Sequence, residues 1–446
     1  MRSLIIALVA ACAPRPTVPA AAPDAPEADQ APDASGPAAA QAVRTEALAA
    51  YAKGDHATFL AKSQRAVALD PTTIVDRYNV ACGHALLGHP DKAFAALGQL
   101  ADEGVDFGFA RDPDFTSLHG DPRWKPLVAR VDALFPVVTT GERAFDMGGA
   151  LGIVPEGIAH DPATGRFFVG SMRTGAVYAI GAEGGVTELA RLEIGGNGVA
   201  ALGLEVDAAR NRLWAVGTAF GLHEGFRPEL EGVSGLFGLD LATGEIEELH
   251  VPEAGSGATF NDLTVAPSGA IYLSGGPPHV FRPGDDVGIE PLPIEPAMAY
   301  SNGITATQDG TALYVAADLQ SIGRVDLETM AWSYLALPEG VNLRSFDGLY
   351  HVPAEGPDAL VGVQLGLGHW RVVRVDLDEA GTAVTGIEVL EQRNPGILSA
   401  TTGVVVGDGL VVIARGPVPE GADVEAVGPL GAMGGPTFGW RVPIHP

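Results

Sequence analysis

The chain is poor in lysine, in cysteine and in long apolar runs. It has 27 basic against 55 acidic side chains, a formal net charge of −28, and two cysteines, Cys12 and Cys82. This charge argues against a phosphate-backbone partner, so nucleic-acid binding is not expected. No apolar run is long enough to cross a bilayer. With one cysteine in a leader and the other inside a helical pattern, neither a disulfide framework nor a zinc cluster is predicted.

Several catalytic signatures are also missing from the sequence. There is no glycine-rich phosphate loop before a helix, no His/Cys cluster, and no nucleophilic serine at a strand-to-helix elbow. A reaction would therefore have to rely on carboxylates, histidines or a cation held by oxygen atoms.

The few lysines are unevenly placed. All of them (Lys53, Lys62, Lys92 and Lys125) precede residue 130, and the rest of the chain uses only arginine as its permanently charged base. This asymmetry indicates two modules of different kind.

The first residues read as a targeting segment. "MRSLIIALVAAC" has one positive charge, a short apolar run and small residues before a cysteine. It resembles a bacterial lipoprotein signal of residues 1–11, which implies cleavage before Cys12, lipidation of Cys12 and anchorage in the cell envelope at the outer membrane or periplasm. The alternative is a plain signal peptide with an incidental cysteine. Residues 12–42, rich in alanine and proline, predict a disordered tether.

Residues 43–136 have a helical period. Gly54 and Gly88 lie 34 residues apart, each between two apolar helical patterns. This stretch resembles two tetratricopeptide repeats followed by a third, degenerate unit. Two readings stay open here: a groove that contacts a protein partner, or a structural adaptor between the tether and the next domain.

From residue 137 to 446 the pattern changes to short alternating strands with Gly, Asp and Pro turns. Six segments share one form, an apolar strand, a turn and a second apolar strand, as in "NDLTVAPSGAIYLSG" and "NGITATQDGTALYVAA". They begin at residues 156, 202, 261, 302, 347 and 402, a spacing that suits one four-stranded blade each. The sequence therefore predicts a mainly β fold, a six-bladed β-propeller, preceded by a small all-α domain.

The first residue of each segment should recur at one height of the central channel, because the innermost strand of each blade lines it. These residues are Glu156, Leu202, Asn261, Asn302, Asp347 and Thr402. Four carry carboxylate or amide oxygens with a formal charge of −2. Oxygen-only ligation favours Ca2+ or another hard divalent cation. Without a cation, two close carboxylates would require one to stay protonated.

Short motifs open four of the first five blades: "PEG" at 155, "ND" at 261, "SNG" at 301 and "DG" at 347. In order and spacing they resemble the senescence-marker-protein/gluconolactonase family, which is related to the paraoxonases. The resemblance implies a calcium-dependent propeller that hydrolyses lactones or related esters. It also implies that Glu156, Asn261, Asn302 and Asp347 are the metal ligands, with Asp347 as general base.

One position departs from the family pattern. Sugar-lactone members carry an arginine two residues before the blade-three asparagine, where this chain has Thr259. A sugar lactone is therefore not the expected substrate. Loops on the same face as the predicted ligands add further candidates for substrate contact, namely His223, Arg227, His279 and His369.

Two functions follow from these features. The first is a metal-dependent hydrolase of small lactones or esters, in which the cation acts as Lewis acid and Asp347 as base. The second is a binding module of the cell envelope, whose ion is structural and whose helical repeats contact a protein. The retained Asp347 favours the enzyme, and Thr259 together with the repeats favours the binding module.

Overall fold

The computed structural model describes residues 37–71, 73–148, 153–253, 255–276, 278–296, 298, 300–317, 320–365, 369–418 and 435–445. Cys12 and most of the predicted tether lie outside these residues. The chain divides into two compact units, the first ending at Leu134 and the second beginning at Phe135. This boundary lies two residues before the position predicted for the start of the propeller.

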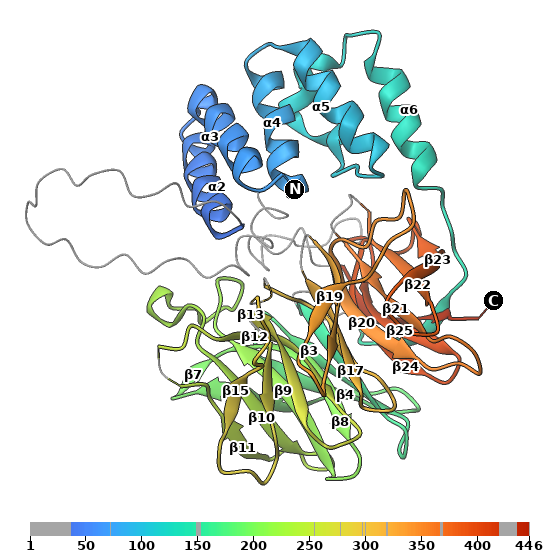
Figure 1. Ribbon diagram of the computed structural model, residues 1–446. Coiled ribbons are helices and arrows are strands. Elements are labelled where there is room, and N and C mark those ends of the chain that lie inside the picture. The colour runs from blue at the N-terminus through green and yellow to red at the C-terminus, as the bar shows by residue number, and fades with distance from the viewer. Residues whose placement is uncertain are drawn as a thin grey trace, which may run out of the picture. The chain divides into compact units, whose positions relative to one another are not determined.

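The first unit is all helical (Figure 1). Its elements are α2 (Pro37–Ala52), α3 (His56–Leu69), α4 (Ile74–Leu86), α5 (Pro90–Asp102), the 3-10 turns η1 (Phe109–Arg111) and η2 (Pro113–Leu118), and α6 (Trp124–Leu134). Each of α2 to α5 packs on the next. Gly54 and Gly88 make the turns after α2 and α4 with φ of 73° and 72°, a conformation that favours glycine.

One detail of this unit differs from the sequence expectation. α2 begins at Pro37, before residue 43, because proline suits a first helical position and an alanine-rich run follows it. The predicted third, degenerate unit consists of the 3-10 turn η2, which begins at Pro113, followed by the helix α6. The tetratricopeptide assignment stays a prediction. No helix among the described residues is long and apolar enough to span a membrane.

The second unit consists of six four-stranded antiparallel sheets and one small two-stranded ribbon. Blades one to three are β2 (Pro155–Asp161), β3 (Arg166–Ser171), β4 (Ala176–Ile180), β5 (Val186–Arg191); β8 (Ala200–Asp207), β9 (Arg212–Thr218), β10 (Ser234–Asp240), β11 (Ile246–His250); and β12 (Thr259–Val265), β13 (Ile271–Gly276), β14 (His279–Phe281), β15 (Ile289–Pro291). The ribbon is β6 (Glu193–Ile194) with β7 (Asn197–Gly198), and the turn η3 (Pro228–Leu230) follows β9.

Blades four to six complete the series. They are β16 (Ile304–Ala306), β17 (Ala312–Ala317), β18 (Ser321–Asp326), β19 (Trp332–Tyr334); β20 (Phe346–Val352), β21 (Ala359–Gln364), β22 (Arg371–Leu377), β23 (Val384–Gln392); and β24 (Ser399–Val406), β25 (Gly409–Arg415), β26 (Thr437–Pro443) with β1 (Glu142–Asp146).

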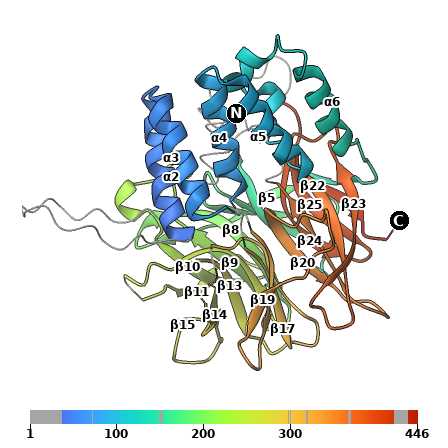
Figure 2. The same ribbon diagram turned by 45° about the horizontal axis from the view of Figure 1, so that its top comes forward.

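The contacts between inner strands show that these sheets close into a ring. Figure 2 shows the strands of this unit from a second direction. Each inner strand contacts the inner strands of both neighbouring blades, and β2 of blade one contacts β24 of blade six. The first strand, β1, completes the last blade by pairing with β26, where Glu142 faces Arg441. The predicted six-bladed propeller is confirmed. As the outermost strand of blade six, β1 pairs with the edge of β26, so both ends of the propeller segment meet in one blade.

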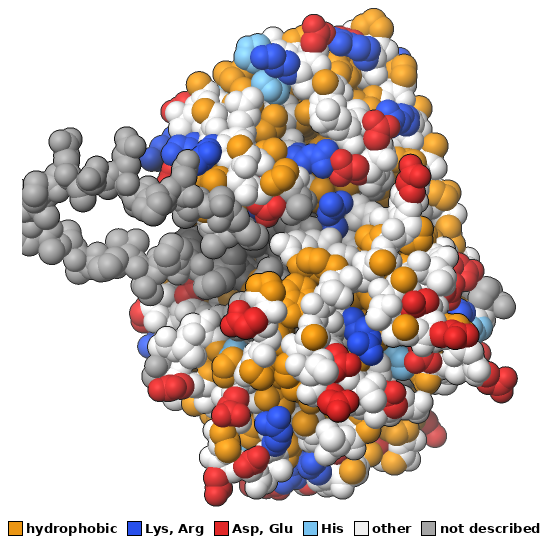
Figure 3. Space-filling view, viewed as in Figure 1, with side chains coloured by type: hydrophobic (Ala, Val, Ile, Leu, Met, Phe, Trp, Pro, Cys, Tyr) orange, Lys and Arg blue, Asp and Glu red, His pale blue; other side chains and the backbone are white. Residues whose placement is uncertain are grey.

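Blade-to-blade packing forms the core. The second strands β17 and β25 are buried along their whole length, whereas β11 at the periphery is mostly exposed. Both faces of a blade's middle strands are covered by neighbouring blades, so these strands are apolar on both sides. On the face in Figure 3 the acidic side chains are scattered and form no single patch.

The strand directions define one functional edge. In every blade the second strand is antiparallel to the first, so it ends where the inner strand begins. We call this edge, where the six inner strands begin, the entry rim. The residues that open each blade therefore share the entry rim with the loops that follow the second strands.

Candidate functional site

A recurring irregularity of the inner strands marks equivalent positions of the six blades. In five inner strands the pairing slips so that two residues oppose one on the second strand; these pairs are 156–157, 202–203, 261–262, 347–348 and 401–402. In blade four the backbones of Asn302 and Gly303 both bond to Ala316, which produces the same arrangement. Such bulges bend a strand and redirect a side chain.

The bulges show which residues are equivalent. Glu156, Leu202, Asn261, Asn302 and Asp347 are each the first residue of their pair. In blade six the first residue is Thr401, because Ala400 pairs with Ala414 and Gly403 with Val412. The sequence analysis predicted Thr402 at this position, one residue away from the position that the bulge defines. A threonine stands at both positions, so the chemistry of the sixth position is unchanged.

The second residue of the pair sets how closely the blades approach. It is glycine in four blades: Gly157, Gly203, Gly303 and Gly348. A Cβ at Gly157 would lie 1.9 Å from the carbonyl oxygen of Leu202, and one at Gly303 would lie 2.4 Å from that of Asp347. Neighbouring inner strands thus touch through their backbones at this height, and glycine is required to let them do so.

We call the first residues of the six bulge pairs the ring. Two of their oxygen atoms have no hydrogen-bond partner among the residues that the structure describes. Glu156 is 7% exposed, yet its Oε2 is buried without a donor, and the buried Oδ1 of half-buried Asn302 also lacks one. Asn261 donates its Nδ2 to the hydroxyl of Tyr300 at 3.3 Å. A buried acceptor without a donor is unfavourable by about 1–3 kcal/mol, so these two oxygens are candidate cation ligands.

The carboxylates of the bulge pairs, Glu156, Asp262 and Asp347, repel one another. Burial raises the pKa of Glu156 well above its usual range, and the carboxylates of Asp347 and Asp262 raise it further. The buried guanidinium of Arg415 opposes this rise. Burial likewise raises the pKa of Asp262 to about 7, although the Leu263 N–H donates to it at 2.9 Å. Three carboxyl groups therefore compete for ionisation in a buried space, a conflict that a bound cation would relieve.

Three acidic or phenolic groups of the channel were missed in the sequence. Asp262 is the second residue of its pair, where four other blades have glycine, and its carboxylate accepts an N–H from Ile304 of the next blade. Glu205 and Tyr350 each stand three residues after the first residue of their pair. Comparing the six blades position by position, beyond their first residue, would have found them.

Glu205 and Tyr350 occupy a second level of the channel. The half-buried Glu205 accepts hydrogen bonds from the Val265 N–H and the Thr264 hydroxyl, and burial raises its pKa to about 8. The Tyr350 hydroxyl accepts the Gly403 N–H at 2.8 Å, and burial raises its pKa well above the usual value. These contacts join blades two with three and five with six below the ring.

The raised pKa of Glu205 predicts a pH-dependent stability. The folded state binds this proton more tightly than the unfolded state, whose value is near 4.5, so stability is lost as pH rises from about 4.5 to about 8. Glu205→Gln removes the titration and keeps an acceptor. We expect it to raise the melting temperature at pH 9 and to have little effect at pH 4.5.

Thermal melts at both pH values, beside the exposed Glu245→Gln as control, measure this effect. If Glu205→Gln changed the melting temperature equally at the two pH values, the raised pKa of Glu205 would be contradicted.

The predicted substrate residues lie in different environments. Thr259 is half-buried two residues before Asn261, and its buried Oγ1 has no hydrogen-bond partner. Arg227 is exposed in the blade-two loop. His369 is half-buried, with its ring 5.4 Å from that of Phe135. Of these three, Thr259 lies on the strand that carries a ring residue.

The other two histidines are buried. His223 accepts the Gly225 N–H at its Nδ1 (3.0 Å), and its ring packs so close to Gly198 that a Cβ there would lie 2.7 Å from it. His279 lies edge-on to Phe260 at 5.4 Å. These contacts give both side chains a packing role: His223 holds the blade-two loop, and His279 packs the interior of blade three.

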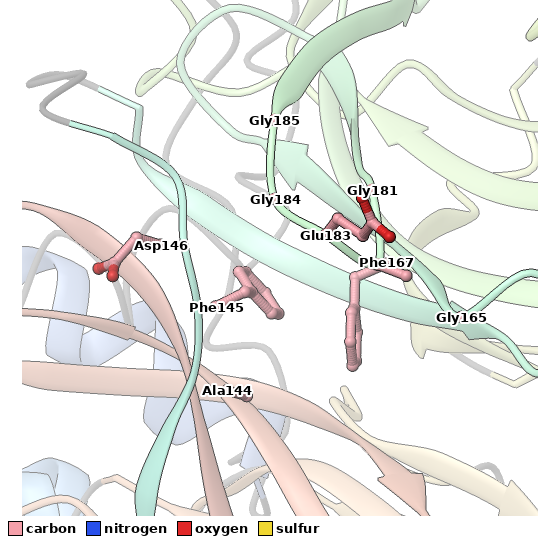
Figure 4. Close-up of a pocket in the computed structure, with 10 residues that line it drawn as sticks. Ala144, Phe145, Asp146, Gly165, Phe167, Gly181, Glu183, Gly184 and Gly185 are labelled. Atoms are coloured by element: carbon pink, nitrogen blue, oxygen red, sulfur yellow. The ribbon is translucent and has the colours of Figure 1, made fainter.

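One concavity of the described residues lies away from the bulge pairs. It has a volume of about 580 Å3 and is lined by Ala144, Phe145, Asp146, Gly165, Phe167 and residues 181–185. Figure 4 shows the Phe145 and Phe167 rings between the carboxylates of Asp146 and Glu183, which lie apart. No residue of the bulge pairs lines it, so it offers no convergent set of polar groups.

A second acidic group belongs to the helical unit. Cys82, Asp112 and Asp114 place one ligand-type atom each within 4.8 Å of one another. The carboxylates already accept the hydroxyls of Tyr78 and Tyr51, both at 2.8 Å, and Asp112 caps η2. These bonds account for the cluster as part of the packing of α4 against η2.

No family model matches the chain, and no curated relative matches it. Among solved structures, it is similar to a luciferin-regenerating enzyme with 13% identity and a TM-score of 0.46, over 68% of this chain and 94% of the other. A gluconolactonase of Xanthomonas campestris has 16% identity and a TM-score of 0.45 (69% and 94% covered). Regucalcin of Agrobacterium tumefaciens, a calcium-binding protein, has 18% identity and a TM-score of 0.45, over 69% of this chain and 95% of the other.

Proposed function

We propose that the propeller is a calcium-dependent hydrolase of lactones or related esters. The observation that carries this proposal is the pair of buried oxygens, Glu156 Oε2 and Asn302 Oδ1, that lack hydrogen-bond donors at equivalent positions of the channel. Asn261 and Asp347 stand at the same level on two further blades.

The residues present fit a hard divalent cation. Glu156, Asn261, Asn302 and Asp347 offer oxygen atoms alone, and their two carboxylates carry a formal charge of −2. Oxygen ligands favour Ca2+ over zinc, which prefers nitrogen and sulfur. A cation would also satisfy the two unpaired oxygens and offset the repulsion that raises the pKa of Glu156.

A bound divalent cation would polarise the carbonyl group of a lactone as a Lewis acid. Asp347 accepts a proton from the attacking water while the water oxygen bonds to the carbonyl carbon. The ring C–O bond then breaks, and Asp347 returns the proton to the departing alkoxide. The products balance as one hydroxy acid from one lactone and one water.

The surrounding side chains position the substrate. Tyr300 is held by the amide of Asn261, and the unpaired hydroxyl of Thr259 lies on the same strand as Asn261. Both offer hydroxyl groups to the ester oxygens. Thr259 stands where sugar-lactone members of the family that the sequence resembles carry an arginine, so the proposed substrate is a lactone other than a sugar lactone.

Calcium should stabilise the folded protein. A ligand bound only to the native state at 100 times its Kd adds about 2.7 kcal/mol to the free energy of unfolding. We expect chelation to lower the melting temperature and calcium to restore it better than zinc. Glu156→Gln should need more calcium for the same shift, whereas Glu183→Gln, on an exposed turn, should behave as wild type.

Turnover of a panel of small neutral lactones, with calcium and after chelation, completes the test. Hydrolysis that is lost on chelation and restored by calcium supports the enzyme. Stabilisation by calcium without turnover of any lactone would instead favour a binding module with a structural ion. A melting temperature indifferent to both calcium and chelator would overturn the metal site itself.

A further inference from the structure

Arg371 differs from the other arginines of the propeller. Those typically face a carboxylate, as in the pairs Arg166–Asp161 (3.7 Å), Arg210–Asp207 (2.6 Å) and Arg374–Asp376 (2.8 Å). Arg371 is half-buried at the start of β22, and no carboxylate among the described residues forms an ion pair with it. Its hydrogen-bond partner is the neutral side chain of Gln364.

A rigid brace holds this guanidinium in place. Arg371 Nε donates to Oε1 of the fully buried Gln364 at 2.6 Å. The Nε2 of Gln364 donates in turn to the carbonyl oxygens of Asn342 (3.0 Å) and Arg344 (2.6 Å). Two carbonyl acceptors fix which end of the amide is nitrogen, so its oxygen must face Arg371. Among the described residues, the hydrogen bond of Arg371 Nε to Gln364 is the one formed by this guanidinium, so its other nitrogens can donate to a ligand.

The brace also directs Arg371 toward the channel. Phe346 pairs with Gln364 and Gln364 with Arg371, so these three residues lie in one row from the inner to the third strand of blade five. Adjacent strands are about 4.8 Å apart. A side chain of β22 that reaches Gln364 therefore leans inward, toward the strand that carries Asp347. The row stands at the entry rim, since β20 and β22 both begin there.

Among the described residues, the absence of a carboxylate partner sets Arg371 apart from the paired arginines Arg166, Arg210 and Arg374. The chain has 55 acidic side chains, so carboxylates are abundant. A desolvated cation without an anion is unfavourable, and burial alone lowers the pKa of Arg371 to about 10. Arg371 is held in place, leans toward the inner strand and has no carboxylate partner among the described residues. These features fit a site in which the ligand itself supplies the anion.

We propose that Arg371 forms an anion subsite of the entry rim that binds a carboxylate of the substrate. This inference rests on the proposed hydrolase function and narrows its substrates to lactones or esters that carry a free carboxylate in addition to the reacting group. Guanidinium groups bind carboxylates through paired N–H donors, which suits this role. Since Arg371 lies two strands, about 10 Å, from β20, the carboxylate stands several bonds away from the reacting carbonyl.

The first test measures binding without turnover, in the full chain saturated with calcium. Glutarate, a dicarboxylate, should raise the melting temperature of the wild type more than its uncharged diamide does. Arg371→Gln should abolish this difference. Arg374→Gln, a half-buried arginine three residues further along β22 that is paired with Asp376, should retain it.

The second test measures specificity in turnover. For a carboxylate-bearing lactone and its methyl ester, the ratio of the two kcat/KM values should fall about 10- to 100-fold in Arg371→Gln, the range expected for loss of a hydrogen-bonded charge pair. Arg371→Lys keeps the charge without the planar fork and should give an intermediate ratio. If Arg371→Gln does not fold, the kcat/KM ratio of Arg371→Lys tests the anion subsite instead.

The outcomes separate the two proposals. If no lactone is hydrolysed but glutarate protects only proteins that retain Arg371, the anion subsite stands and the hydrolase fails. If lactones are hydrolysed and neither the ratio nor the glutarate effect changes in Arg371→Gln and Arg371→Lys, the subsite is overturned and the hydrolase stands.

Discussion

Asp347→Asn is expected to lower the turnover of the best lactone by about 10² to 10⁴ while changing substrate binding little. The substitution removes the group that accepts a proton from water but keeps an oxygen that can ligate a cation. Calcium should therefore still bind, with its affinity reduced by the loss of one charge. Steady-state kinetics at saturating calcium, together with a calcium titration followed by the melting temperature, measure the two effects separately.

Glu156→Gln is the matched comparison, because it removes the other ring carboxylate. It should weaken calcium affinity, and excess calcium should restore much of the activity. If calcium instead rescued Asp347→Asn and not Glu156→Gln, the roles of the two carboxylates would be reversed. Full activity in both variants would move the chemistry away from the ring.

Gly157→Ala should destabilise the propeller by about 3 kcal/mol, the upper end of the usual effect of overpacking. The added Cβ would lie 1.9 Å from the backbone carbonyl oxygen of Leu202, and a backbone atom cannot turn aside as a flexible side chain can. The blades would have to separate at the ring, so Glu156 would move with its neighbour. We therefore expect calcium stabilisation to fall together with the melting temperature.

Gly356→Ala is the control for this substitution. Gly356 lies in the turn between β20 and β21 of the same propeller, and a Cβ there would meet no atom within 4 Å. Its denaturant midpoint and calcium response should equal those of the wild type. A Gly157→Ala protein as stable as Gly356→Ala would show that the inner strands tolerate separation at this level.

The architecture was open to prediction because it depends on local, repeated patterns. An apolar strand, a turn and another apolar strand recur six times, and each copy specifies its own hairpin regardless of the others. The same repetition brought Glu156, Asn261, Asn302 and Asp347 to equivalent positions of their blades. The closure of blade six by β1 was not predicted, because that pairing joins residues about 300 apart in the chain.

The sequence by itself determined the number of blades and the residue type that opens each of them, since both follow from short-range alternation of polar and apolar residues. Tertiary structure decided what surrounds those residues. A bulge, which alternation alone does not locate, placed Thr401 rather than Thr402 on the ring. Burial and pairing are relations between distant segments: they leave the oxygens of Glu156 and Asn302 without donors, and they leave Arg371 braced by Gln364 with no carboxylate among the described residues.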